Sequence, residues 1–353
     1  MLGQHIRDYA NARIEGAVPT ILGSAGVDIF FVISGFVMVI TAGDGRMGPG
    51  EFAKRRLVRV VPLYWLFTLL MLALLLVGMR PAGVSGWSWS NVATSFLFLP
   101  QTRADGWPGP ILPVGWTLNY EMFFYLVFAM GLCVARGARL VALIGTVFVA
   151  LVGAGMAARM AAPVGLSFPV RFYTDPILLE FVAGCGLGLM YLQRPAAEAG
   201  GKDARLRLLG VGLIVAGVAG FWPGATSELG VGPWRALAFG VPSLLLVAGA
   251  VVLEQSGLRT KSRWVMLFGA ASYAMYLSHM LILQTIEKLS VARLPQSPVI
   301  IALTALVGIV AVVVASIGIH LWIETPLVRW LRVRSPTARG ELPASAERGN
   351  RAG

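Results

Sequence analysis

Charged side chains are scarce in this chain. They make up 13% of its 353 residues, against 57% hydrophobic residues and a mean hydropathy of +0.74. A soluble domain carries about 25% charged residues. The scarcity therefore excludes a soluble globular fold and indicates a protein with several membrane spans. The first sixteen residues also lack the apolar stretch of a cleavable signal peptide.

Cysteine and histidine are rare as well. The two Cys, Cys133 and Cys185, both lie inside apolar runs, which excludes a disulfide framework and a cysteine metal site. The three His are His5, His279 and His320, and no metal-ligand spacing, nucleophile elbow or phosphate loop occurs in the sequence. We therefore expect no metal and no bound cofactor.

Long apolar runs dominate instead. A membrane-spanning helix needs about 20 mostly apolar residues, and the sequence predicts about nine of them, so the expected fold is an all-α polytopic membrane helix bundle. The predicted spans are 24–42, 60–79, 114–134, 140–159, 174–192, 208–223, 236–253, 264–286 and 299–322. The apolar stretch 91–100 is too short to cross and is expected to be interfacial or re-entrant.

Basic residues favour one side of this predicted topology. Of the 29 Lys and Arg, 20 lie on one side and 9 on the other. The positive-inside rule assigns the richer side, which includes the C-terminus, to the cytoplasm. The net charge of +12 therefore reports topology and contact with membrane lipid, and we expect no nucleic acid partner.

Nine spans and a cytoplasmic C-terminus place the N-terminus on the other side of the membrane. Residues 1–16 are then either a short extracytoplasmic segment or the remnant of a truncated first helix. The predicted division is this N-terminal segment, a transmembrane domain at 17–332, and a polar, disordered cytoplasmic tail at 333–353.

Polar residues inside the spans are candidate site residues, because ionisable groups in hydrocarbon are expensive. Asp28 and Ser34 lie in "AGVDIFFVISGFVMVI", and Glu121 lies in "GWTLNYEMFFYL" with Trp116 and Tyr125 at helical spacings. The alternative for Glu121 is a structural pair with a buried Arg. The alternative for the aromatic residues is an interfacial belt or packing in the core.

Two further segments carry candidates. In "KRRLVRVVPLYW", Arg56 and Arg59 can hold phosphates at the membrane surface or simply anchor the topology. In "SYAMYLSHMLIL", His279 lies within the eighth predicted span, where an interhelical hydrogen bond is the alternative to catalysis.

The segments "GVDIFFVISGF", "RRLVRVVPLYW", "WTLNYEMFFY", "SYAMYLSH" and "IETP", in this order, resemble the integral-membrane acyltransferase 3 family, in particular its exopolysaccharide production branch. The resemblance covers about residues 20–330. It implies an inner-membrane enzyme of bacteria that moves a non-aminoacyl group, typically acetyl, from cytoplasmic acyl-CoA to a hydroxyl of a lipid-linked or polymeric surface carbohydrate.

The resemblance also implies roles for individual residues. Members of this family have about ten helices, with a catalytic His on the first, which is missing here. Either His5 is that residue after a short lead, or the family His is encoded upstream of Met1. From the chemistry of the transfer, we expect Asp28 to fix either a base or the acceptor sugar, Glu121 to act as a catalytic or orienting carboxylate, and Arg56 and Arg59 to bind the phosphates of acyl-CoA. The notch Ser34-Gly35-Phe36 would admit another helix or an acyl chain.

Two other functions remain open from the residues alone. A transporter or flippase of lipid-linked sugars would use intramembrane carboxylates as relay sites, although no internal repeat is detectable. A non-catalytic partner in polysaccharide assembly would need no reactive site.

The predicted topology places residues 43–59 in the cytoplasm and residues 80–113 on the opposite side. Reporter fusions at about residues 50 and 100 should therefore report opposite sides, because the basic residues favour retention of the first loop. Two fusions that report the same side would contradict this topology.

Overall fold

The computed structural model describes residues 21–42, 47–81, 84, 86–104, 106, 109–161, 165–193, 203–226, 234–295 and 297–333. All regular elements in these ranges are helices, so the all-α prediction is confirmed. The predictions for His5, for segment 1–16 and for the tail beyond Val333 lie outside the described residues and stay predictions.

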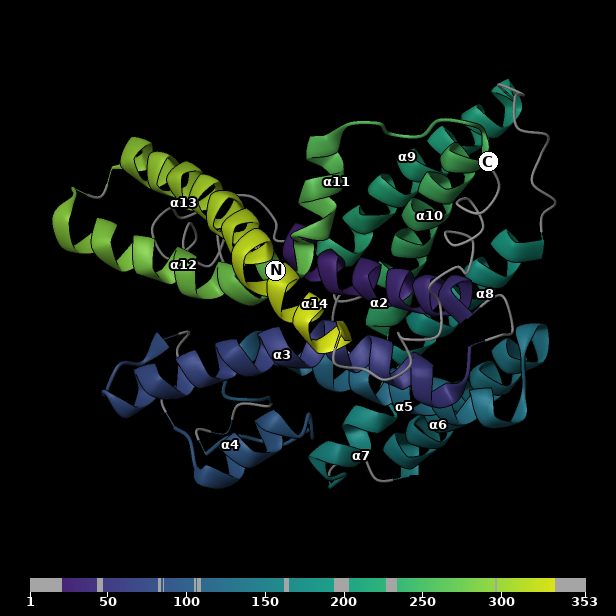
Figure 1. Ribbon diagram of the computed structural model, residues 1–353, viewed down its shortest axis with the longest axis horizontal. Helices are drawn as coiled ribbons and strands as arrows, with labels where there is room; N and C mark the ends of the chain where they lie inside the picture. The colour runs from purple at the N-terminus through teal and green to yellow at the C-terminus, as the bar shows by residue number, and fades with distance from the viewer. Residues whose placement is uncertain are drawn as a thin grey trace, which may run out of the picture.

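The helices follow one another along the chain and pack as a bundle (Figure 1). They are α2 (Ile21–Ala42), α3 (Pro49–Leu76), α4 (Trp89–Phe96), the short η2 (Pro113–Gly115), α5 (Trp116–Val134), α6 (Gly137–Ala161), α7 (Phe168–Tyr173), α8 (Leu178–Gln193), α9 (Ala204–Thr226), α10 (Arg235–Gln255), α11 (Arg263–Ala270), α12 (Ser272–Arg293), α13 (Pro298–Ile319), the π-helical turn η5 (His320–Glu324) and α14 (Thr325–Val333).

Each predicted span has a helical counterpart. In the described ranges eight helices are long and apolar enough to cross a membrane, or nine if α11 and α12 form one span bent by 64°. The second helix begins at Pro49 rather than at residue 60, because the helix continues through its basic first turns, where hydropathy is low. The apolar stretch 91–100, expected to be too short to cross the membrane, overlaps α4, a helix of eight residues.

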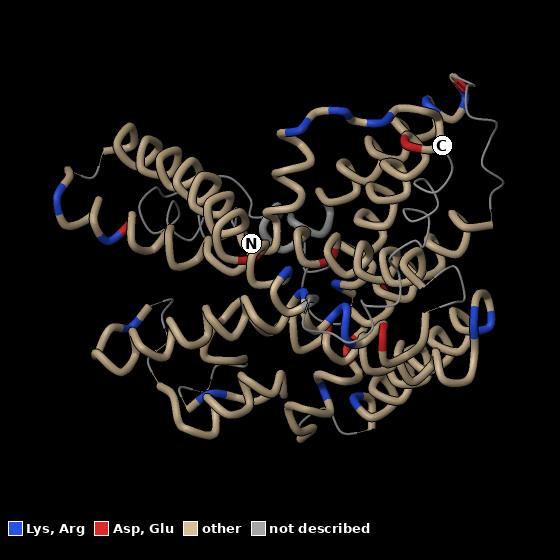
Figure 2. The backbone as a smooth tube through the Cα atoms, in the orientation of Figure 1, with Lys and Arg blue, Asp and Glu red and all other residues tan. Residues whose placement is uncertain are grey.

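Charged residues gather at the ends and connections of the helices, whereas long stretches of helix carry none (Figure 2). This distribution is the one expected for helices surrounded by hydrocarbon. The few charges inside the bundle are therefore the exceptions that need a partner or a function.

The close crossing of α2 and α8 is made by glycines. A Cβ atom on Gly35 would lie 2.1 Å from the Phe181 carbonyl oxygen, and one on Gly184 would lie 2.0 Å from the Val32 carbonyl oxygen. Small residues permit such backbone contact between membrane helices. The sequence left open whether the notch at Ser34-Gly35-Phe36 admits a helix or an acyl chain, and the structure places a helix there. The thiol of Cys185 is buried at the same crossing.

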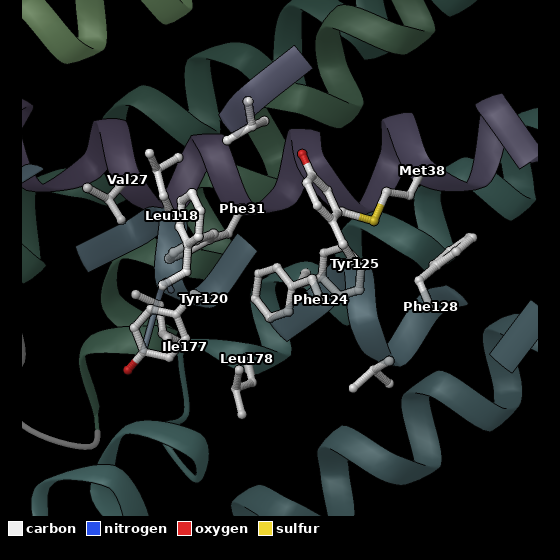
Figure 3. Close-up of a cluster of buried hydrophobic side chains, with 14 of the residues drawn as sticks. Val27, Phe31, Met38, Leu118, Tyr120, Phe124, Tyr125, Phe128, Ile177 and Leu178 are labelled. Atoms are coloured by element: carbon white, nitrogen blue, oxygen red, sulfur yellow. The ribbon is translucent and has the colours of Figure 1, made fainter. Parts of the chain in front are cut away.

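An aromatic core sets the rotation of α5 against α2 and α8 (Figure 3). The ring of Phe124 stacks on Phe181 at 4.1 Å between centroids and meets Phe31 and Phe148 edge-on at 5.5 and 5.6 Å. Aromatic pairs in these geometries contribute about 0.5–1.5 kcal/mol beyond their buried area. The packing of Phe124 fixes the orientation of Glu121 and Tyr125, which lie within one turn of it on the same helix.

Substitution of Gly184 by Ala should destabilise the protein, because the new methyl group would overlap the backbone of α2. Overpacking of this kind costs about 1–3 kcal/mol. The measurement is thermal unfolding of the detergent-purified protein, followed by size-exclusion chromatography. Gly186→Ala is the matched control on the same helix, since nothing lies within 4 Å of a Cβ placed there. Equal melting temperatures for the two variants would contradict the close crossing.

Candidate active site

Two groups of polar side chains lie along α2. The first, the Asp28 cluster, consists of Asp28, Glu180 and Arg235. The second, the Glu121 cluster, consists of Ser34, Arg56, Glu121 and Tyr125. Ser34 follows Asp28 by six residues, which is a rise of about 9 Å along a helix. The two clusters therefore occupy different levels of the same helix.

Asp28 is held in a two-pronged ion pair with Arg235. The arginine Nη1 donates to Oδ1 at 2.9 Å and Nη2 donates to Oδ2 at 2.7 Å. The Asp28 side chain is 0% exposed, whereas that of Arg235 is 25% exposed. Paired geometry of this kind is the strongest form of carboxylate–guanidinium contact. It compensates the buried charge that made Asp28 stand out in the sequence.

Glu180 of α8 is the third member of the Asp28 cluster. Its carboxylate is buried and interacts electrostatically with those of Asp28 and Asp175. Neither of its oxygens has a hydrogen-bond partner among the described residues. Its interaction with Asp28 is therefore one between charges. Gly240 of α10 makes room for it, because a Cβ there would lie 2.9 Å from the Glu180 Cγ.

The Glu121 cluster joins α2 to α5. Glu121 is buried, its carboxylate accepts a hydrogen bond from the hydroxyl of Tyr125, and the hydroxyl of Ser34 interacts with it. Tyr125 lies one turn further along α5, while Ser34 comes from α2 beside the glycine crossing. The sequence identified these residues separately, and the structure brings them together.

Arg56 ties α3 to the C-terminal turn of α2. Its guanidinium donates to the Val37 carbonyl oxygen at 3.3 Å and to the Thr41 Oγ1 at 2.8 Å. A cation there also interacts favourably with the helix dipole. The positive charges of Arg56 and Arg59 reach Glu121, and Arg59 itself is exposed. The two arginines therefore differ: Arg56 is a structural tie, and Arg59 is open to a ligand.

The described contacts of Trp116 and His279 are with residues outside the two clusters. Trp116 packs edge-on against Tyr120 at 6.1 Å between ring centroids. His279 is buried, and its Nδ1 lies 2.8 Å from the carbonyl oxygen of Tyr276 and 3.2 Å from that of Met275. These contacts place Trp116 at the start of α5 and His279 against its own helix.

The sequence analysis did not identify one residue of the Asp28 cluster and one residue beside the Glu121 cluster. Arg235 entered only as a topology charge, because it is 207 residues from Asp28 and no local spacing connects them. Tyr273 of α12 was not singled out, yet its hydroxyl donates to the Val60 carbonyl oxygen at 2.7 Å and lies within the field of Glu121. In the described part of the chain no group of three or more His, Cys, Asp or Glu is suited to a metal.

These features define a polytopic membrane protein whose interior holds a hydroxyl-bonded carboxylate close to two arginines at one end of a buried helix. Such an arrangement fits an enzyme that carries out acid–base chemistry on a bound anionic molecule.

The chain belongs to the acyltransferase-domain family, whose profile matches residues 4–320. It is 35% identical over 320 residues to the exopolysaccharide production protein ExoZ of Rhizobium meliloti (strain 1021), covering 90% of this chain and 93% of that protein. It is 26% identical over 359 aligned residues to the acyltransferase MdmB of Streptomyces mycarofaciens, covering 93% of this chain and 87% of that protein. No solved structure matches the chain significantly.

Membership of this family confirms the resemblance seen in the sequence motifs. The chain is an acyltransferase of groups other than aminoacyl groups, embedded in a membrane by its apolar helices. This identification favours the enzyme over the transporter and over the non-catalytic assembly partner.

Neutralising one member of the Asp28–Arg235 pair should lower the free energy of unfolding of the protein. Removal of one partner from a buried ion pair costs about 3–5 kcal/mol, because the other charge is left uncompensated. Asp28→Asn and Arg235→Gln should each lower the melting temperature in detergent, and the double variant should lose less than the sum of the two. Glu51→Gln, in the exposed pair with Arg55, is the control and should change stability by about 0–1 kcal/mol. Strictly additive losses at Asp28 and Arg235 would contradict the pairing.

Proposed function

We propose that the protein transfers an acyl group, in the first instance acetyl, from acyl-CoA to a hydroxyl of an exopolysaccharide or other cell-surface sugar. The family supports acyl transfer, and the name of one relative supports a polysaccharide acceptor. The observation that carries the proposal is the Glu121 cluster, in which a buried carboxylate bonded to the Tyr125 hydroxyl lies within the field of Arg56 and Arg59.

The donor is proposed to bind at the Arg59 end of α3. Arg59 is exposed one turn after Arg56, and guanidinium groups bind phosphate oxygens in pairs. The Nη2 of Arg56 already donates to Val37 and Thr41, and Arg56 is less exposed than Arg59. We therefore assign the phosphates of CoA chiefly to Arg59, and to Arg56 the task of holding the end of α2 against α3.

The chemistry requires a base and a held nucleophile. The acceptor hydroxyl must lose its proton as its oxygen attacks the thioester carbon. Glu121 can take that proton or orient the group that takes it, because the bond from Tyr125 fixes the direction of its carboxylate. His5 is a further candidate for the base and lies outside the described residues.

The acceptor is proposed to approach from the Asp28 end of α2. Asp28 and Thr41 are thirteen residues apart, about 20 Å along the helix. The proposal sets the protein in a bacterial inner membrane with the Arg59 end in the cytoplasm, where acyl-CoA is available; the positive-inside bias supports this orientation. The acyl group would therefore travel along α2 from the arginines towards the Asp28 cluster.

The test uses the purified chain with radiolabelled acetyl-CoA and an exopolysaccharide fragment, and measures free CoA and labelled carbohydrate. Glu121→Gln should lower kcat about 100-fold or more, the range of general acid–base groups. Arg59→Gln should raise KM for acetyl-CoA about tenfold, the loss of one charge-assisted hydrogen bond. Arg80→Gln, an exposed arginine beyond the other end of α3, should change neither.

Absence of acetyl-CoA turnover in the unmodified chain would refute the proposed function. Release of free CoA without labelled carbohydrate would support acetyl-CoA as the donor and refute the proposed carbohydrate acceptor. Normal turnover by a folded Glu121→Gln protein would return Glu121 to a structural role.

A further inference from the structure

A histidine–carboxylate pair lies at the junction of α13 and α14. The Nδ1 of His320 is 2.8 Å from the Oε2 of Glu324. Both belong to the π-helical turn η5, which is closed by a bond from the Thr325 amide to the His320 carbonyl oxygen. Pro326 follows and has no N–H for the α-helical bond to Trp322, so the change of register has a local cause. Turns of this kind frequently mark functional sites.

The turn separates its side chains by polarity. Leu321, Trp322 and Ile323 are exposed, Trp322 by 80%. The side chains of His320 and Glu324 are only 17% and 5% exposed. The two ionisable residues therefore face the bundle, while the three apolar residues between them face outwards. Since an ionisable residue within a span is expensive, the pair is a candidate functional site.

The pair lies beside the donor end of the proposed active site. The charge of Glu324 reaches Tyr273, as does that of Glu121. The hydroxyl of Tyr273 bonds the carbonyl oxygen of Val60, the residue directly after Arg59. The short helix α14 packs against α3, towards which it runs from the end of α13 (Figure 1). Tyr273 thus stands between the Glu121 cluster and the His320–Glu324 pair.

We propose that His320, oriented by Glu324, is the general acid that protonates the leaving thiolate of acyl-CoA. The inference rests on the proposed function and adds to it a residue for the donor half of the reaction. A carboxylate accepts hydrogen bonds only, so Glu324 holds the proton of Nδ1 and leaves Nε2 to exchange protons. The imidazolium form of His320, with a proton on each ring nitrogen, is the form that donates from Nε2 in the transfer.

The step balances without another reactant. The acceptor oxygen forms a bond to the acyl carbon, the carbon–sulfur bond breaks, and its electron pair stays on sulfur. The sulfur takes the Nε2 proton, which leaves His320 neutral, with its proton on Nδ1 and still donated to Glu324. The proton of the acceptor hydroxyl goes to the base of the Glu121 cluster.

The experiment compares two donors that differ in their need for a proton. One is acetyl-CoA, and the other is the acetyl thioester of 4-nitrothiophenol, whose acidic thiol leaves readily as an anion. His320→Gln should lower turnover of acetyl-CoA about 100-fold or more, while turnover of the aryl thioester stays close to that of the unmodified chain. Glu324→Gln should show the same dependence on the donor with a smaller loss.

Two further variants make the readout specific. Glu121→Gln should impair both donors alike, because its role concerns the acceptor hydroxyl. Glu254→Gln removes a carboxylate from an exposed pair with Arg259, in which Glu254 Oε1 lies 3.2 Å from Arg259 Nε, and should affect neither donor.

If a folded His320→Gln protein loses turnover of both donors equally, or of neither, the assignment of His320 is wrong and the proposed function is untouched. If His320→Gln does not elute as a single folded species, the dependence of Glu324→Gln on the donor decides in its place. An unmodified chain that turns over neither donor would overturn the proposed function together with this inference.

Discussion

The backbone contact between α2 and α8 is the constraint on which the two polar clusters depend. It exists because Gly35 and Gly184 carry no side chain at the crossing, so van der Waals packing between the helices replaces the side chains that would otherwise separate them. Once α2 is held there, the directions of its polar side chains are fixed. Asp28 faces Glu180 and Arg235, and Ser34 faces Glu121.

Three of the buried carboxylates in the described part of the bundle are compensated in three different ways. Asp28 has a guanidinium partner, Glu121 has a hydroxyl donor with arginine charges close by, and Glu324 has an imidazole on its own turn. An ion pair with two bonds rigidifies a site, whereas hydroxyls and an imidazole can release or exchange a proton without breaking the fold. This difference is why we place the chemistry at Glu121 and His320 and a structural task at Asp28.

Much of this arrangement was predictable from the sequence, for physical reasons that differ between its parts. The spans follow from local hydropathy, and the candidates Ser34, Glu121, Tyr125 and Arg56 follow from polarity in an apolar surrounding. Their grouping does not, because the contacts that bring α2, α3 and α5 together join residues far apart in the chain. Arg235 and Tyr273 were missed because their partners are distant in the chain, and the pair of His320 and Glu324 was missed because only the turn of the helix brings their side chains together.

The glycine crossing also provides its own chemical reporter. The backbone nitrogen of Cys185 lies at this crossing and its thiol is buried, whereas Cys133, near the end of α5, is exposed. The natural chain therefore holds two thiols in opposite environments, one at the surface of the folded bundle and one inside it. Alkylation kinetics can thus follow the local opening of the bundle around α8 against an internal standard, without introducing a probe that would disturb the packing it reports.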